Sequence, residues 1–329
     1  MSSEQQTETR NAKGRPPRKI GRWFFLGAMA LAVIVAALPL LSGRERITLD
    51  DKARAALKDE SFVRLRDGVT HYQWQGPETG RRVVLVHGFS SPYFVWDRNV
   101  TALTQAGFRV LRLDLYGRGL SERLQSEYTG DVFDRQLLGL LDALNVKEPV
   151  DLVGLSMGGA IVTRFTDRHP ERVRKLVLIG TAGVNGLPTV AKFVLTPLVG
   201  DWFVRVFGDF VISHAMPREV AGDASGLAEA EAAYANQLQY RGYKRALIST
   251  LQYGPLTDQD EAFSRVGHQH REGMLLWGTL DTVVPYKVHE RVSELIPWLD
   301  FHPIDGGRHC VNYENADKVN PILIAFLAK

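Results

Sequence analysis

The sequence around Ser156 constrains the fold more than any other part of this 329-residue chain. An apolar run from Asp151 onward passes through Gly154, Ser156 and Gly158 and continues into a helical pattern. A strand that turns into a helix within two residues needs glycines beside the turn residue, because the two backbones nearly touch there. The Gly-x-Ser-x-Gly pattern alone is weak evidence, but the strand before it and the helix after it predict an exposed serine at the carboxyl edge of a sheet.

Other apolar segments predicted to be strands are also followed by polar side chains that could take part in catalysis. The segment 82–86 is followed by His87 and Gly88, 108–113 by Asp114, and 273–278 by Asp281, while His309 precedes a final helical stretch. Helical periodicity is found in the segments between the strands: 96–106, 132–144, 157–169 and 286–295. This alternation predicts a mainly parallel sheet covered by helices on both faces. Polar residues at the strand ends then meet at one edge of the sheet.

From about Arg82 to the C-terminus, the chain resembles the α/β-hydrolase superfamily in its esterase, lipase and monoacylglycerol-lipase-like branch. The resemblance rests on the Ser156 elbow, the His87-Gly88 motif, the turn that begins at Asp114, the Asp281 loop and the terminal Gly-x-His309, all in family order. It implies an α/β-hydrolase fold: a mostly parallel eight-stranded sheet flanked by helices, with a helical cap inserted after the sixth strand.

The residue types predict acyl transfer through a serine. Ser156 would be the nucleophile, His309 the base that takes its proton, and Asp281 the acid that orients the imidazole. The backbone N–H groups of Phe89 and Met157 would form the oxyanion hole. This chemistry requires neither a metal ion nor an organic cofactor, so none is expected.

Four other residues compete for these roles. His87 is a second candidate base, although its place before Gly88 favours support of the oxyanion loop. Asp114 and Asp305 are alternatives to Asp281, and Asp114 lies in a glycine-rich turn that favours a structural role. Cys310, beside His309, could be a thiol nucleophile, but a small packing residue is the simpler interpretation.

More than ninety residues separate two predicted neighbouring strands, at 176–180 and 274–277. A structureless loop of that length is improbable, so 184–263 is predicted to form the helical cap. Its apolar side chains could line an acyl pocket or simply pack the cap onto the core. The pocket candidates are Phe193, Leu198, Trp202 and Phe203.

The N-terminal segment differs in composition from the rest. Residues 1–22 carry six basic and two acidic side chains, and 23–41 carry no charge. As a helix, 23–41 would be ~28 Å long, enough to cross a bilayer. We expect a cytoplasmic tail, a transmembrane signal-anchor and a catalytic domain on the periplasmic or extracellular side, although Arg44 and Arg46 weaken this orientation. Secretion after signal-peptide cleavage is the alternative.

The remaining boundaries depend on these segments. Residues 42–60 are expected to be a linker, and 61–183 and 264–329 the two parts of the hydrolase core. The formal net charge of +3 arises from the tail, so it does not indicate nucleic-acid binding. One cysteine excludes an intrachain disulfide, and the sequence does not indicate an oligomeric state.

The predicted function is hydrolysis of carboxylic esters, with short- to medium-chain acyl esters or monoacylglycerols as small-molecule or lipid substrates. A carbon–carbon hydrolase of vinylogous diketones on the same triad is one alternative. Such enzymes usually carry Gly-Pro-Gly after the first His-Gly and a Trp soon after the terminal His. Those places here hold Ser90-Ser91-Pro92 and Val311-Asn312-Tyr313, which makes this alternative less favoured. A ligand-binding receptor of the same fold, with incidental turnover, is the other alternative.

Overall fold

A computed structural model describes residues 20–41, 43–186, 192, 194–196, 198–256 and 259–329. The chain divides into two units, Met1–Ser42 and Gly43–Lys329, and each is described by itself. In the first unit, α1 (Ile20–Leu41) forms where an apolar helix is expected. In the part of the chain that the structure describes, no helix combines the length and the apolar character needed to cross a membrane. The structure therefore does not support the expected transmembrane span at 23–41.

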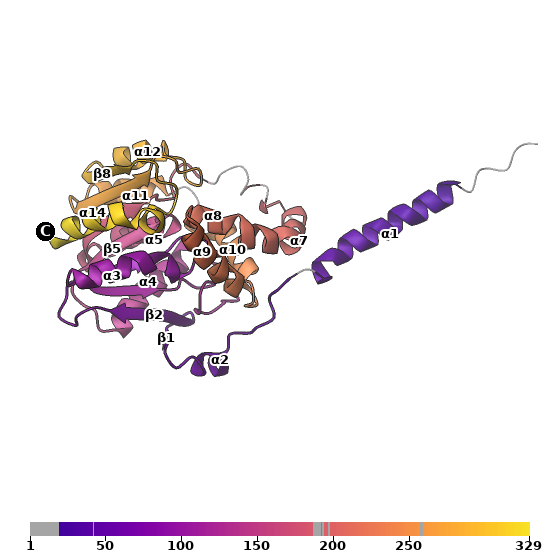
Figure 1. Cartoon of the computed structure of the whole chain (residues 1–329), viewed down its shortest axis with the longest axis horizontal. Helices are drawn as coiled ribbons and strands as arrows, with labels where there is room; N and C mark the ends of the chain where they lie inside the picture. Colours follow the sequence, from indigo (N-terminus) through magenta and orange to yellow (C-terminus); the bar gives the residue numbers. More distant parts are fainter. Residues whose placement is uncertain (1–19, 42, 187–191, 193, 197, 257–258) are drawn as a thin grey trace, which may run out of the picture. The chain divides into compact units, whose positions relative to one another are not determined.

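The second unit is built on one eight-stranded sheet (Figure 1). Its strands lie in the order β1-β2-β4-β3-β5-β6-β7-β8, and only the β1–β2 and β2–β4 pairs are antiparallel. The strands are β1 (Ser61–Arg64), β2 (Val69–Gln75), β3 (Arg82–Val86), β4 (Arg109–Leu113), β5 (Val150–Leu155), β6 (Val173–Ile179), β7 (Glu272–Gly278) and β8 (Leu299–Ile304). The predicted mostly parallel sheet is confirmed.

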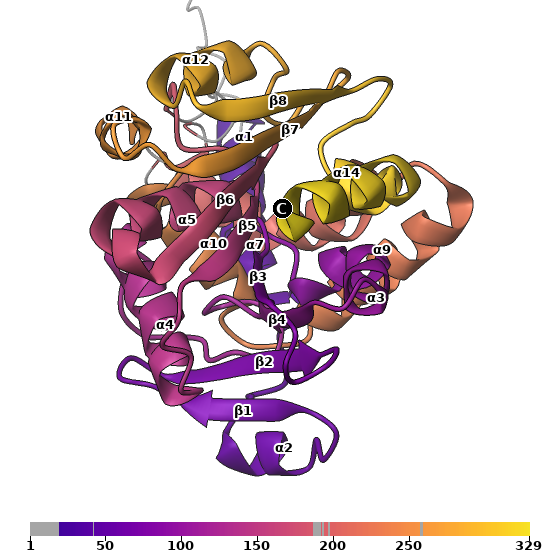
Figure 2. The ribbon, with the colours of Figure 1, turned by 90° about the vertical axis from the view of Figure 1, so that its left-hand side faces the viewer.

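Helices cover both faces of this sheet (Figure 2). One face carries α4 (Gly130–Ala143), α5 (Met157–Arg168), α11 (Asp260–Gly267) and α12 (Val288–Leu295), and the other carries α3 (Asp97–Gln105) and α14 (Ala316–Ala328). Two apolar clusters correspond to these two layers. Every residue of the central strand β5 is buried, as expected for a parallel strand covered on both sides.

The antiparallel edge begins with a short helix and a hairpin. The side chain of Asp50 accepts a hydrogen bond from the Ala53 N–H and so caps α2 (Asp51–Ala55). The predicted turn at 67–68 joins β1 to β2, and Leu65 N–H donates to the Gly68 carbonyl. Local signals were sufficient to predict this part of the chain.

A helical insertion connects β6 to β7 (Figure 1). It contains α7 (Val199–His214), α8 (Met216–Val220), α9 (Ala224–Gln237) and α10 (Tyr243–Tyr253), and α11 comes after them. The predicted helical cap after the sixth strand therefore exists, while its boundaries at 184 and 263 stay predictions. The remaining short helices are η1 (Tyr93–Trp96), η2 (Pro170–Arg172) and α13 (Val311–Glu314).

Candidate active site

Ser156 occupies the tight turn between β5 and α5. Its backbone has φ 55° and ψ −120°, a conformation that a non-glycine residue adopts only where the surroundings enforce it. A β-carbon on Gly158 would lie 2.2 Å from the Val86 carbonyl oxygen, and one on Gly154 would lie 2.5 Å from the Gly158 carbonyl oxygen. Both glycines are therefore required for the strand and helix to approach, and the serine is held at the carboxyl edge of the sheet.

His309 and Asp281, the predicted base and acid, form a hydrogen-bonded pair. His309 Nδ1 lies 2.8 Å from Asp281 Oδ2, and both side chains are buried. The other Asp281 oxygen accepts hydrogen bonds from the N–H groups of Val283, at 2.9 Å, and Val284, at 3.0 Å. These bonds fix the carboxylate, which in turn fixes the imidazole with Nδ1 as a donor, the tautomer in which Nε2 can accept a proton.

Ser156 and His309 line one cavity of ≈ 140 Å³. Among the described residues, no hydrogen bond joins the Ser156 hydroxyl to His309. Nucleophile–base hydrogen bonds are often long before a substrate binds and shorten in the complex, so this geometry is compatible with the predicted roles.

The predicted oxyanion-hole donors also lie beside Ser156. Met157 is the first residue of α5, so its N–H has no acceptor within the helix. Phe89 lines the same cavity as Ser156, and a β-carbon on the neighbouring Gly88 would lie 3.3 Å from the Ser156 β-carbon. A glycine at 88 therefore allows the loop to approach the nucleophile.

Both ring nitrogens of His87, the second candidate base, contact backbone groups near these donors. Its Nε2 accepts from the Leu115 N–H at 2.8 Å, which leaves Nδ1 to donate to the Gly88 carbonyl at 2.9 Å. In a trans peptide the C=O and N–H groups point in opposite directions, so holding the Gly88 oxygen directs the Phe89 N–H. Burial lowers the pKa of His87 to about 4, which keeps the ring neutral at physiological pH.

Arg118 holds the next peptide group of the same loop. Its Nε donates to the Phe89 carbonyl at 2.8 Å and one Nη donates to the Tyr116 carbonyl at 3.1 Å. The guanidinium is fully buried, and burial lowers its pKa to about 10. Arg118 was not selected from the sequence, although its place in the glycine-rich turn after Asp114 was a usable signal.

The rival acids and the rival nucleophile are not placed for catalysis. Asp114 pairs with His71 at 2.6 Å and caps the turn through the Leu120 N–H at 2.9 Å. The Asp305 side chain is exposed and, within the part of the chain that the structure describes, accepts only a long hydrogen bond, 3.4 Å, from Thr279. Burial raises the pKa of the Cys310 thiol well above its usual value, with further increases from nearby carboxylates, so it does not ionise readily.

A second cavity, of ≈ 370 Å³, also reaches Ser156. Phe89, Ser156 and Val283 line both cavities, whereas His309 lines only the smaller one. We call them the small cavity and the apolar cavity. Asn185 and Ser156 are the only polar residues among the described residues of the apolar cavity, whose other walls include 182–184, Leu251, Leu256 and 283–285.

The predicted acyl-pocket residues lie elsewhere. Leu198 is 86% exposed, and neither it nor Trp202 and Phe203 of α7 lines either cavity at Ser156. Trp202 and Phe203 instead pack against Phe207 of the same helix. Phe193 lies outside the described residues. The acyl pocket therefore stays a prediction, because an apolar helix pattern does not identify what its side chains contact.

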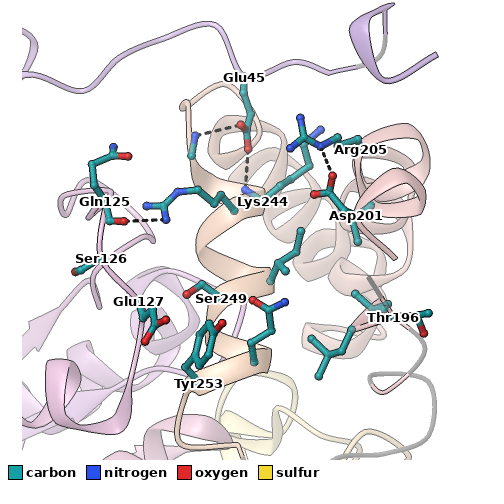
Figure 3. A pocket seen from close by; sticks show the side chains of 17 residues that line it. Glu45, Gln125, Ser126, Glu127, Thr196, Asp201, Arg205, Lys244, Ser249 and Tyr253 are labelled. Atoms are coloured by element: carbon teal, nitrogen blue, oxygen red, sulfur yellow. Dashed lines mark hydrogen bonds and ion pairs between the residues drawn. The ribbon is translucent and has the colours of Figure 1, made fainter. Parts of the chain in front are cut away.

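A larger cavity, of ≈ 640 Å³, lies between α7 and α10 (Figure 3). Glu45 accepts from the Gly242 and Lys244 N–H groups at the start of α10, and Arg205 pairs with Asp201 on α7. None of Ser156, Asp281 and His309 lines this cavity, so its size does not make it the reaction site. Within the described ranges, no cluster of three or more histidine, cysteine, aspartate or glutamate side chains could hold a metal ion.

Comparisons with known proteins agree with this geometry. The profile of the alpha/beta hydrolase fold family matches residues 81–316. The chain is 32% identical over 282 residues to a 2-hydroxy-6-oxononadienedioate/2-hydroxy-6-oxononatrienedioate hydrolase of Paraburkholderia xenovorans, covering 81% of this chain and 94% of that protein. The chain therefore belongs to the alpha/beta hydrolase fold family and is a hydrolase.

Further similarities extend this result. The Escherichia coli K12 hydrolase of the same name is 30% identical over 266 residues, covering 78% of this chain and 88% of that protein. Among solved structures, an enol-lactonase from Burkholderia xenovorans LB400 superposes with a TM-score of 0.70 at 22% identity, covering 82% of this chain and all of that one. A meta-cleavage product hydrolase from Pseudomonas fluorescens has a TM-score of 0.64 at 24% identity, covering 82% and 97%. The structural similarities support the fold.

Proposed function

We propose that the chain hydrolyses the carbon–carbon bond beside the ketone of a vinylogous diketone. The supporting observation is that its relatives, similar over most of their length, are named for 2-hydroxy-6-oxo-dienedioate substrates. Such molecules contain an enol, a ketone and carboxylates but no ester or amide, so a hydrolase can act only at the bond next to the ketone. The comparisons favour this reaction over the ester hydrolysis expected from the sequence.

The residues of the site can perform this reaction. His309 Nε2 takes the hydroxyl proton while Ser156 Oγ bonds to the ketone carbon, and the ketone oxygen becomes an oxyanion near the N–H groups of Phe89 and Met157. When this intermediate collapses, the carbon–carbon bond breaks and its electrons pass into the conjugated leaving part, which receives the proton from His309. Water, with His309 again as base, then releases the carboxylic acid from Ser156.

Carboxylic ester hydrolysis is the second candidate. It uses the same steps with an alcohol as the leaving group. The observation that favours it is that no lysine or arginine is among the described residues of either cavity at Ser156. A substrate with carboxylates at both ends would find no positive partner there, whereas an apolar acyl ester needs none.

Turnover of matched substrates separates the two reactions. We expect the full-length protein to cleave a phenyl-substituted 2-hydroxy-6-oxo-dienoate, seen as loss of the dienolate absorbance and release of benzoate in equal amounts. Ser156→Ala should abolish this turnover. Cleavage of p-nitrophenyl and glyceryl butyrates without any cleavage of the dienoate or of its methyl ester would replace the carbon–carbon reaction with ester hydrolysis. Release of one equivalent and then arrest would indicate a receptor.

The location of the hydrolase unit is a separate proposal, and it rests on charge. Six basic residues precede a segment without charge at 23–41, the arrangement that keeps a tail in the cytoplasm and exports the residues C-terminal to the segment. We propose that Gly43–Lys329 lies on the non-cytoplasmic side. A C-terminal reporter active only outside the cytoplasm should function, and one active only inside should not. The size of the native protein distinguishes retention of the segment from cleavage near Gly43.

A further inference from the structure

The two cavities at Ser156 differ in whether His309 lines them. The leaving part must lie where His309 can protonate it, and His309 lines only the small cavity. The acyl part, which stays on Ser156, then occupies the apolar cavity. This assignment depends only on the side of Ser156 on which His309 lies. It therefore holds whether the leaving part is protonated on a carbon or is an alcohol.

The small cavity contains one carboxylate that the reaction does not use. Glu219 of α8 lines it together with Met216, Tyr234 and His309. Glu219 is partly buried, and the structure gives its side chain no hydrogen bond or ion pair among the described residues. Its negative charge acts on the cavity wall, since it contributes to the raised pKa values of Tyr234 and Cys310, for which burial is the main cause.

The groups around Glu219 do not neutralise it. No lysine or arginine is among the described residues of the small cavity. The His309 ring directs Nδ1 to Asp281, and Tyr234 shares a hydrogen bond with Ser90 at 2.9 Å. A carboxylate accepts hydrogen bonds and repels a second carboxylate held a few ångströms away.

We propose that Glu219 determines the specificity of the leaving side, admitting an uncharged, hydroxyl-bearing group and rejecting a carboxylate. This inference rests on the proposed hydrolase function and departs from the substrates named for the relatives, which are dioates. A hydroxyl in the small cavity donates to Glu219, whereas a carboxylate faces it without a cation. The substrate class is therefore a carbonyl compound with an apolar acyl part and a neutral, hydroxylated leaving part.

The test uses two matched substrate pairs and the full chain. One pair is the phenyl-substituted dienoate and its methyl ester; the other is O-butyryl-lactate and glyceryl monobutyrate. We expect the wild-type protein to prefer the uncharged member of a pair by about 100-fold in kcat/KM. Glu219→Gln should reduce this preference to below about 10-fold, and Glu219→Lys should reverse it. The exposed Glu290, which lines neither cavity at Ser156, provides the control: Glu290→Gln should keep the wild-type preference.

Two further esters test the hydroxyl. Glyceryl monobutyrate should be cleaved several-fold faster than ethyl butyrate, and Glu219→Leu should remove this difference. A preference for butyrylcholine over the glyceryl ester would instead show that Glu219 binds a cationic leaving part. It would overturn the proposal that the leaving part is neutral and hydroxylated.

The outcomes separate this inference from the proposed function. If only the esters are cleaved, but with the expected charge preference, the carbon–carbon reaction fails and the role of Glu219 stands. If the charged and uncharged dienoates are cleaved equally well, or if Glu219→Lys leaves the preference unchanged, the role of Glu219 fails and the reaction stands. The wild-type preference decides the question even if a variant does not fold.

Discussion

The second unit contains two buried histidine–aspartate pairs that differ in the partner of the second ring nitrogen of the histidine. His309 Nδ1 lies 2.8 Å from Asp281, and His71 Nδ1 lies 2.6 Å from Asp114. The second nitrogen of His71 also has a carboxylate partner, Glu60, at 2.7 Å. The ring of His309 instead lines the small cavity beside Ser156.

This difference teaches that the pair alone does not identify a catalytic base. Burial by itself would lower the pKa of His71, but hydrogen bonds and charge from Asp114 and Glu60 raise it. Its ring therefore favours the charged form and connects β2 to the turn after β4. His309 has one carboxylate to orient it and one nitrogen available for a substrate proton. We expect catalysis to depend on that second nitrogen, which has no hydrogen-bond partner among the described residues.

The largest expected difference between the pairs concerns turnover. Asp281→Asn should lower kcat by about 10⁴, because the amide no longer holds the imidazole in the required tautomer. Steady-state kinetics on any substrate that the protein cleaves measures this loss. Asp305→Asn is the control and should stay within about twofold. A loss below tenfold for Asp281→Asn would show that another group orients His309.

The same substitution in the other pair should act on stability. Asp114→Asn removes the partner of a buried histidine whose pKa is raised, so the free energy of unfolding should fall by about 3 kcal/mol. The kcat of the folded fraction should change far less than in Asp281→Asn. Denaturant unfolding monitored by tryptophan fluorescence gives the first quantity. A 10⁴-fold loss of kcat in a variant of unchanged stability would make Asp114 a catalytic residue.

A third buried histidine, His87, has backbone partners in place of a carboxylate. His87→Ala should lower kcat by about 10–100-fold, because the Gly88 carbonyl loses its donor and the Phe89 N–H is no longer held in direction. KM should change much less, since His87 lines neither cavity at Ser156. Circular dichroism checks that the variant is folded. Unchanged kcat in folded protein would contradict the orienting role.

The smallest effect is the pH dependence of stability. The pKa of His71 is higher in the folded state than in the unfolded chain, so its stabilisation is complete below the unfolded pKa and is lost as pH rises through the folded one. His71→Gln should remove a decline in unfolding free energy above neutral pH, with a slope of at most about 1.4 kcal/mol per pH unit.

Its partner has the opposite dependence. Burial would raise the pKa of Asp114, but the His71 hydrogen bond and charge lower it to about 2. That stabilisation is present above the unfolded pKa, ~3.9, and disappears as pH falls towards 2.

A wild-type stability that stays constant from neutral to alkaline pH would show that His71 is neutral in the folded protein.

Local signals predicted the parts of the site that lie at strand ends. The Ser156 elbow, the histidine before Gly88, the Asp281 loop and His309 were all found from motifs, because each lies where a parallel strand ends and parallel strands share one edge. The acyl pocket stays a prediction, since the described candidates Leu198, Trp202 and Phe203 line neither cavity at Ser156 and helical periodicity does not identify what an apolar side chain contacts. Neither Arg118 nor Glu219 was selected.

The sequence by itself determined the hydrolase fold and predicted which polar residues gather at one edge of the sheet, because both depend on short-range patterns and on glycines that only a tight turn requires. The catalytic triad stays a prediction. Only the tertiary structure decided which histidine keeps a free nitrogen and which cavity contains a carboxylate. His71 and Asp114 are 43 residues apart in the chain, and Glu219 lies 63 residues after Ser156. Such neighbours are set by the packing of helices onto the sheet, which no local pattern specifies.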